Sequence, residues 1–279
     1  MNKIIKKEFL SGNVYRMEIE APRIAQSRKP GHFVIIRISE GGERIPLTIA
    51  DADAARGTIT LIVQIVGCTS AKLSKLNEGD FISDVVGPLG NATHIEKIGT
   101  VLCAGGGVGI APLYPIVQGF KQAGNRVVTI LAARSADLII LEKEMAEFSD
   151  ELVVMTDDGS RGKKGLVTAG MEKVIQREKV DQAVVIGPAV MMKFAAITTK
   201  KYNIPTMASL NTIMVDGTGM CGACRCSVDG KTKFVCVDGP EFDAHQVNFD
   251  EMLQRLGAYK EEEMAAYQQY LIKKLKNNG

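Results

Sequence analysis

The chain has 279 residues, of which 46% are hydrophobic and 24% charged, and its formal net charge is +2. These values exclude an intrinsically disordered chain and suggest one large domain or two medium-sized ones. The basic residues form no long run, so no nucleic-acid partner is expected. Neither a signal-peptide core nor an apolar stretch of roughly 20 residues is visible, so we expect a cytoplasmic protein with no membrane partner.

The first predicted domain covers residues 1–98 and consists of short strands. Apolar runs at 32–38, 57–67 and 80–90 alternate with Gly, Pro and Asp punctuation. Short strands without long helices between them are typical of a small β-barrel.

The pattern changes near residue 99, where strands begin to alternate with helices. Strands are predicted at 100–103, 126–135, 151–160 and 182–187, and helices after residue 109, at 138–148, at 170–179 and after residue 188. This alternation indicates a parallel sheet with crossover helices, an α/β domain covering 99–205.

Two shorter parts complete the chain. Residues 206–249 hold four of the six cysteines. Residues 250–279 are predicted to be a C-terminal amphipathic helix, because Met252, Leu256 and Met264 can share one face.

A glycine-rich turn at 104–112 directly follows the first strand of the α/β domain. Glycines there let the backbone approach a pyrophosphate, and the N-terminus of the following helix offers free N–H groups. Tight packing between strand and helix is the alternative. Gly187 and Pro188 follow a later strand and are expected at the same sheet edge. The candidate nucleotide-binding residues in the turn are Gly105, Gly106, Gly107, Gly109 and Pro112.

Two charged residues end neighbouring strands of this domain. Arg134 could reach the adenosine ribose or its phosphate, or be a solvated loop arginine. Asp157 lies at the same edge and could instead be a loop or N-cap residue.

The barrel has its own candidate site. Arg44 and Thr48 are four residues apart, which places a cation and a hydroxyl on one face of a strand. A surface arginine and an edge-strand threonine are the alternative. Gly67, Thr69 and Ser70 follow a later strand and could form a second phosphate-binding turn.

The clustered cysteines suggest a metal centre, either Zn²⁺ or a [2Fe–2S] cluster. Only one C-x₂-C pair is present, Cys221 and Cys224, whereas zinc ribbons have two. The plant-type iron–sulfur spacing fits if Asp216 stands at the first ligand position and Cys236 at the last, giving D-x₄-C-x₂-C-x₁₁-C. Asp216 could instead only shape a turn, and Cys226 could be the fourth ligand.

Several motifs, taken in order, resemble the ferredoxin–NADP reductase superfamily: RIPLTIAD, VGCTS, VVGPLG, AGGGVGIAP and IGP. The resemblance implies an FAD-binding barrel followed by a nucleotide-binding domain. It places Arg44 at the FAD pyrophosphate and Thr48 near flavin N5. The remaining residues it assigns are Ile45, Pro46, Leu47, Ile62, Val63 and Gln64 along the flavin, and Gly67, Thr69 and Ser70 at the phosphates. Ile186 stands where the superfamily often has cysteine, and its flavin-covering C-terminal aromatic has no counterpart here.

Further motifs, MVDGTGMCGACR and VCVDGPEFDAH, closely resemble the small subunits of NADH-dependent ferredoxin–NADP oxidoreductases, a family that includes sulfide dehydrogenase β subunits. This resemblance implies a cluster with one Asp and three Cys ligands, NAD(H) as the nucleotide with NADP(H) possible, and a larger flavin and [4Fe–4S] partner that exchanges electrons with ferredoxin. Electron-transfer subunits of dihydroorotate dehydrogenase are related but have cysteine at the position of Asp216. Such a subunit, or a nucleotide-sensing module with structural zinc, is the alternative function.

Overall fold

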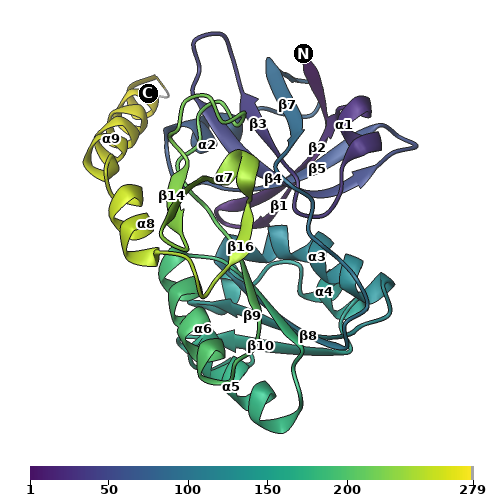
Figure 1. Ribbon diagram of the computed structural model, residues 1–279. Helices are drawn as coiled ribbons and strands as arrows, with labels where there is room; N and C mark the ends of the chain where they lie inside the picture. The colour runs from purple at the N-terminus through teal and green to yellow at the C-terminus, as the bar shows by residue number, and fades with distance from the viewer. Residues whose placement is uncertain (278–279) are drawn as a thin grey trace.

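An antiparallel β-barrel forms the N-terminal part of the computed structural model, which describes residues 1–277 (Figure 1). Its sheet has the strand order β6-β1-β2-β5-β4-β3-β7. The strands are β1 (Asn2–Ser11), β2 (Val14–Glu20), β3 (Phe33–Arg37), β4 (Arg44–Asp53), β5 (Thr58–Gln64), β6 (Phe81–Ile82) and β7 (Asp84–Leu89). Two short helices, α1 (Pro22–Ser27) and α2 (Cys68–Leu73), connect them.

The barrel core follows from alternation along each strand. Val34 and Ile36 of β3, and Ile59 and Leu61 of β5, are fully buried in one apolar cluster. Their neighbours in sequence point outward, because successive side chains of a strand lie on opposite faces. The outward residues are therefore free to face the second domain or a ligand.

The second domain is a doubly wound α/β sheet with the strand order β11-β10-β9-β8-β12-β13-β16. Neighbouring strands are parallel except at β13 and β16. Its strands are β8 (Thr100–Gly106), β9 (Arg126–Ala133), β10 (Glu151–Thr156), β11 (Lys163–Lys164), β12 (Gln182–Ile186), β13 (Thr206–Ser209) and β16 (Glu241–Asp243). Its helices are η1 (Gly107–Gly109), α3 (Ile110–Gln122), η2 (Ala136–Leu138), α4 (Glu142–Glu147), α5 (Val167–Arg177) and α6 (Ala189–Lys201). The predicted fold class, a β-barrel followed by a parallel α/β domain, is confirmed.

Two details of this domain differ from the sequence prediction. The helix predicted at 138–148 is interrupted, because Ile140 and Leu141 are buried in the core and Leu141 adopts φ +56°. The sheet also takes β13 and β16 from residues that we expected to belong to the cysteine segment. Strands this short carry too little periodicity to be recognised.

The cysteine segment contains the hairpin β14 (Arg225–Val228) and β15 (Lys231–Phe234), followed by α7 (Val235–Asp238). The predicted C-terminal helix is two helices, α8 (Phe249–Leu256) and α9 (Lys260–Asn277), separated at Gly257; its last two residues lie outside the described part of the chain. Helix α9 returns to the barrel beside α2 (Figure 1). Among residues 1–277, no helix has both the length and the apolar character required to cross a membrane.

The barrel and the α/β domain share an apolar core. Val14, Ala50 and Ile62 of the barrel are buried in one cluster with residues of α3, including Ile110 and Leu113. An ion pair of 2.7 Å between Arg16 Nη2 and Glu144 Oε1 also joins the two domains. This joint core fixes the outward face of the barrel relative to the α/β sheet.

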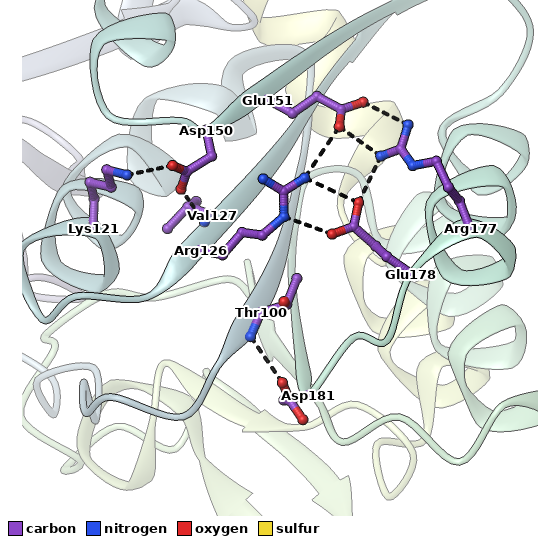
Figure 2. Close-up of polar contacts among 9 residues, drawn as sticks. All are labelled: Thr100, Lys121, Arg126, Val127, Asp150, Glu151, Arg177, Glu178 and Asp181. Atoms are coloured by element: carbon purple, nitrogen blue, oxygen red, sulfur yellow. Dashed lines mark hydrogen bonds and ion pairs between the residues drawn. The ribbon is translucent and has the colours of Figure 1, made fainter.

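An ion-pair network lies at the amino end of the parallel strands (Figure 2). Arg126 Nε lies 2.7 Å from Glu178 Oε2, and Arg177 Nη2 lies 2.8 Å from Glu178 Oε1 and 2.6 Å from Glu151 Oε2. The hydrogen bond from Arg126, helped by Arg177, lowers the pKa of Glu178 from 4.5 to about 2. The network joins the start of β9, the start of β10 and the end of α5.

Replacing Glu178 with glutamine is expected to lower the free energy of unfolding by about 1 kcal/mol at pH 7, a value kept small because both arginines are half exposed. A carboxylate with a lowered pKa stabilises the folded state above its ordinary pKa, and that stabilisation fades as the pH falls from about 4.5 towards 2. Urea unfolding should be measured at pH 7 and at about pH 3.5, roughly one unit below the ordinary pKa of a glutamate. The difference in the free energy of unfolding between variant and wild type should be smaller at the lower pH. Glu172→Gln is the control, because Glu172 Oε1 makes only a loose ion pair, 3.7 Å from Lys201 Nζ. A difference independent of pH would contradict this account.

Candidate cofactor and cluster site

Strand β4 presents the candidate flavin residues on its two faces. Ile45 and Leu47 pack against the barrel core, so Arg44, Pro46 and Thr48 point outward. Their cross-strand partners on β3 are Arg37 for Arg44, Ile35 for Pro46 and Phe33 for Thr48. Only the outward three can therefore meet a ligand through their side chains, while Ile45 and Leu47 can contribute backbone groups.

The Arg44 guanidinium is only loosely engaged within the chain. Its Nη2 lies 3.9 Å from Asp84 Oδ2, and the same carboxylate makes a much closer ion pair with Arg37. Arg37 therefore largely neutralises Asp84. Arg44 keeps most of its five N–H donors for an anion such as a pyrophosphate.

Strand β5 places Ile62 and Gln64 on the outward face and Val63 in the barrel core. We expected all three to line the flavin, but the Val63 side chain is turned away from that face. Ile62 is buried against α3, so it closes the joint between the two domains rather than an open surface.

The turn before α2 has hydroxyls that already have partners. The Ser70 hydroxyl accepts hydrogen bonds from the backbone N–H groups of Val66 and Gly67, both at 3.0 Å. The Thr69 hydroxyl donates to a carboxylate oxygen of Glu43. A phosphate bound at this turn would have to displace Glu43 from Thr69.

The two glycine turns of the α/β domain meet at the sheet edge. A Cβ on Gly109 would lie 2.6 Å from the Ile186 carbonyl oxygen and 2.7 Å from the Gly187 Cα, so neither turn leaves room for a side chain. β8 lies between β9 and β12, and its neighbours continue the sheet in opposite directions. This reversal is where open α/β sheets bind nucleotides, beyond the carboxyl ends of the strands.

The other candidate nucleotide residues surround this point. Gly105 and Gly106 end β8, Gly107 adopts φ +56°, and Pro112 lies in the first turn of α3. Pro188 is the N-cap residue of α6. Arg134 and Asp157 are exposed at the same edge, where the Asp157 N–H donates to the Ala133 carbonyl at 3.1 Å.

Sequence reasoning missed Met191. A Cβ on Gly187 would lie 3.0 Å from its sulfur, and Gly106 packs against the same sulfur. Met191 therefore covers both glycine turns from α6. Its position three residues after Pro188 was the only available signal.

The candidate cluster ligands form two pairs. Asp216 accepts hydrogen bonds from the N–H groups of Thr218 (2.8 Å) and Cys221 (2.9 Å), so its carboxylate does shape the turn. In the second pair, the sulfur atoms of Cys224 and Cys236 lie 3.2 Å apart. Burial and the Cys224 thiol raise the pKa of Cys236 to about 12, and a metal must displace that proton to bind. Within residues 1–277, no three His, Cys, Asp or Glu residues are already arranged around one metal position.

Cys226 belongs to the same buried cluster as Cys224 and Cys236. It is buried on β14, opposite Lys233 of β15, and the groups that act on its thiol are Glu251 and Arg255 on α8, the Cys224 thiol and Asp238. Burial raises its pKa to about 11. The Cys226 thiol is therefore near both α8 and Cys224, whereas Asp216 acts on Cys236 and accepts the Cys221 N–H.

The cluster loop, residues 210–224 between β13 and β14, packs directly on the barrel. A Cβ on Gly217 would lie 2.7 Å from both Ile35 Cγ1 and Leu89 Cδ1, so a side chain has no room there. Gly217 also has φ +76°, a backbone conformation that favours glycine. Ile35 is the cross-strand partner of Pro46. Neighbouring strands are roughly 4.8 Å apart. The cluster loop is therefore one strand away from the outward face of β4.

Comparison with known proteins agrees with this arrangement. Residues 2–94 match an oxidoreductase FAD-binding domain, 104–196 an oxidoreductase NAD-binding domain, and 211–248 the iron–sulfur cluster binding domain of dihydroorotate dehydrogenase B. A homolog of the dihydroorotate dehydrogenase B electron transfer subunit from Thermotoga maritima is 49% identical over 97% of this chain and 96% of its own. The chain belongs to this family of electron-transfer subunits.

Two further relatives place the subunit within the family. A probable dihydroorotate dehydrogenase B electron transfer subunit from Methanocaldococcus jannaschii is 35% identical over 83% of this chain and 84% of its own. A chain of an NADH-dependent reduced ferredoxin–NADP oxidoreductase structure, described in connection with flavin-based electron bifurcation, is 48% identical, with a TM-score of 0.92 over 97% of this chain and 98% of that chain. This electron-transfer subunit is an oxidoreductase of the ferredoxin reductase superfamily that binds FAD, NAD and an iron–sulfur cluster.

Proposed function

We propose that this subunit moves electrons from NADH through FAD and a [2Fe–2S] cluster to a larger flavin and [4Fe–4S] subunit, which exchanges electrons with NADP(H) and ferredoxin. The observation that carries the proposal is the contact of Gly217 with Ile35, which sets the cluster loop beside the outward face of β4. Its functional units are an FAD-binding barrel (1–98), a nucleotide-binding α/β domain (99–205), a cluster-binding segment (206–249) and a C-terminal helical part (250–279). We also propose a cytoplasmic location, which agrees with the presence of six free cysteines.

FAD supplies the chemistry, because it accepts two electrons as a hydride and releases electrons singly. The protein binds and orients the reactants. Arg44 would hold the FAD pyrophosphate, Thr48 would contact the flavin ring from β4, and the glycine turns would admit the dinucleotide. The joint core around Ile62 keeps water out between the two domains.

Four side chains would hold the cluster, and they lie in two pairs. Asp216 and Cys221 form the first pair, and Cys224 and Cys236 the second. An ionised carboxylate has about four lone-pair sites, so Asp216 can bind iron while still accepting its two backbone hydrogen bonds. Its harder oxygen would change the cluster potential relative to a thiolate.

The cluster loop also offers a contact surface for a partner. Cys221 is exposed, and Met220 (89%), Val215 (47%) and Val237 (42%) expose apolar side chains on the same loop and on α7. Exposed apolar groups beside an electron carrier favour a docked protein. A dihydroorotate dehydrogenase is the second candidate partner, because residues 211–248 match that enzyme's cluster domain.

Anaerobic isolation of the native subunit from its own cells, followed by mass spectrometry, tests the proposal. We expect a larger flavoprotein with [4Fe–4S] cysteine motifs in equal amount. A dihydroorotate dehydrogenase would establish the second candidate. A subunit without any partner that reduces ferredoxin directly would contradict both.

Arg44→Ala is expected to weaken FAD binding by about tenfold to a hundredfold, because one bidentate charge-assisted contact to the pyrophosphate is lost. Fluorescence quenching of added FAD gives the Kd. Arg56→Ala is the control, since Arg56 also belongs to the barrel but is paired with Glu18 at 3.1 Å and has no contact with Arg44 or Asp84 among the described residues. Equal losses in both variants would show that Arg44 has no specific role.

A further inference from the structure

The hydroxyl of Thr212 is buried without a hydrogen-bond partner. The residue is 8% exposed, and no donor or acceptor within residues 1–277 meets its Oγ1. The other unpartnered atoms belong to charged groups with nearby partners, since Glu18 Oε2 lies 3.1 Å from Arg56 Nη2 and Arg28 Nη2 donates to the Ala50 carbonyl. A buried hydroxyl almost always has a partner, because leaving it unpaired is costly.

Thr212 lies on the segment that leads from the sheet edge at the glycine turns to the barrel strands β3 and β4. Val185 of β12 pairs with Ala208 of β13, so Leu210 leaves the sheet at the level of Gly187. Seven residues further on, Gly217 rests on Ile35, whose cross-strand partner is Pro46. The segment therefore runs past the place where a nicotinamide at Gly187 must approach a flavin on β4.

Buried apolar residues flank Thr212 in the sequence, two positions before it and two after it. Leu210 and Met214 on either side are buried in one cluster with Phe33 and Ile35 of the barrel. A valine would fill such a position at no polar cost. A hydroxyl here needs an acceptor that the polypeptide does not supply, and the flavin ring carries carbonyl oxygens and ring nitrogens along its polar edge.

We propose that Thr212 is a cofactor-contacting residue whose hydroxyl donates a hydrogen bond to the polar edge of the FAD ring. This inference rests on the proposed function, because it requires FAD on the outward face of β4. This hydrogen bond orients the FAD ring towards the glycine turns and changes the reduction potential of the flavin. Thr212 precedes Asp216 by four residues on the same segment.

The test compares Thr212→Val, Thr212→Ser and wild type as the full chain, with FAD added to the cofactor-free protein. Valine keeps the shape of threonine and removes the unpaired hydroxyl. It should raise the melting temperature of the cofactor-free chain, weaken FAD binding about tenfold, and reduce the stabilisation that FAD confers. The reduction potential of the bound FAD should shift by about 30 mV if the losses of affinity for reduced and for oxidised FAD differ by a factor of ten. Thr212→Ser should stay close to wild type.

A matched control is Thr198→Val, because the Thr198 hydroxyl is buried but donates to the Phe194 carbonyl within α6. It should leave FAD affinity and potential unchanged. Wild type that binds no FAD would defeat the proposed function itself. Unchanged FAD affinity, spectrum and potential in Thr212→Val would overturn only this inference, and a buried water would be the partner. A change confined to the KM for NADH would also overturn it, assigning the hydroxyl to the nucleotide.

Discussion

Replacing Asp216 with alanine is expected to reduce the iron content from two per chain to well below one, because one iron loses a ligand and two backbone N–H groups lose their acceptor. Iron and labile sulfide analysis, together with the electron paramagnetic resonance signal of the reduced cluster, measure the loss. Cys226→Ser should keep the full cluster, since the predicted ligand spacing D-x₄-C-x₂-C-x₁₁-C leaves Cys226 out.

Two more variants separate ligation from loop shaping. Asp216→Cys restores a thiolate ligand and should keep a cluster with an altered potential. Asp216→Asn keeps an acceptor for only one of the two backbone N–H groups and loses the anionic ligand, and should lose iron. The opposite result, with asparagine retaining the cluster and cysteine losing it, would mean that Asp216 only shapes the turn. Cluster loss in Cys226→Ser would make Cys226 the fourth ligand.

Gly109→Ala is expected to abolish NADH-dependent flavin reduction, at least a hundredfold, and to lower the free energy of unfolding by about 1–3 kcal/mol. The added methyl would lie 2.6 Å from the Ile186 carbonyl oxygen, and neither that backbone nor the adjacent Gly187 can yield without moving β12 away from β8. Both glycine turns of the nucleotide site would then separate. Stopped-flow bleaching of the flavin absorbance by NADH gives the rate.

Gly12→Ala is the matched control, because a Cβ there meets no atom within 4 Å. It should change neither the rate nor the stability by more than a small amount. FAD content should be unaffected in both variants, since Arg44 and the barrel are not displaced. Near-normal reduction by NADH in Gly109→Ala would exclude the glycine turns as the dinucleotide site.

Local sequence patterns predict much of this molecule. The sequence predicts one strand that ends in the glycines at 105–107 and another that ends at Gly187, and the structure brings the two turns together at one edge of the sheet. Their role in binding the dinucleotide stays a prediction. The spacing of Asp216, Cys221, Cys224 and Cys236 selects residues that the structure brings together in two pairs, and their role as ligands in preference to Cys226 stays a prediction.

Contacts between distant segments lie beyond such patterns. β13 and β16 join the sheet through pairing across more than thirty residues, a register that no local periodicity encodes. Gly217 is an ordinary turn glycine in the sequence, and only its contact with Ile35 shows that it sets the distance from cluster to barrel. The inward turn of Val63, the interrupted helix at Leu141 and the unpaired hydroxyl of Thr212 likewise follow from packing.

The most direct test is an anaerobic titration of the purified subunit, loaded with FAD and iron–sulfur cluster, with NADH and without any partner. Flavin absorbance and the cluster's electron paramagnetic resonance signal are followed together, and dithionite provides the fully reduced reference. We expect NADH to bleach the flavin and then to produce the reduced-cluster signal within the same chain. Flavin bleaching with no cluster signal, when dithionite does produce one, would contradict electron transfer from flavin to cluster in this protein.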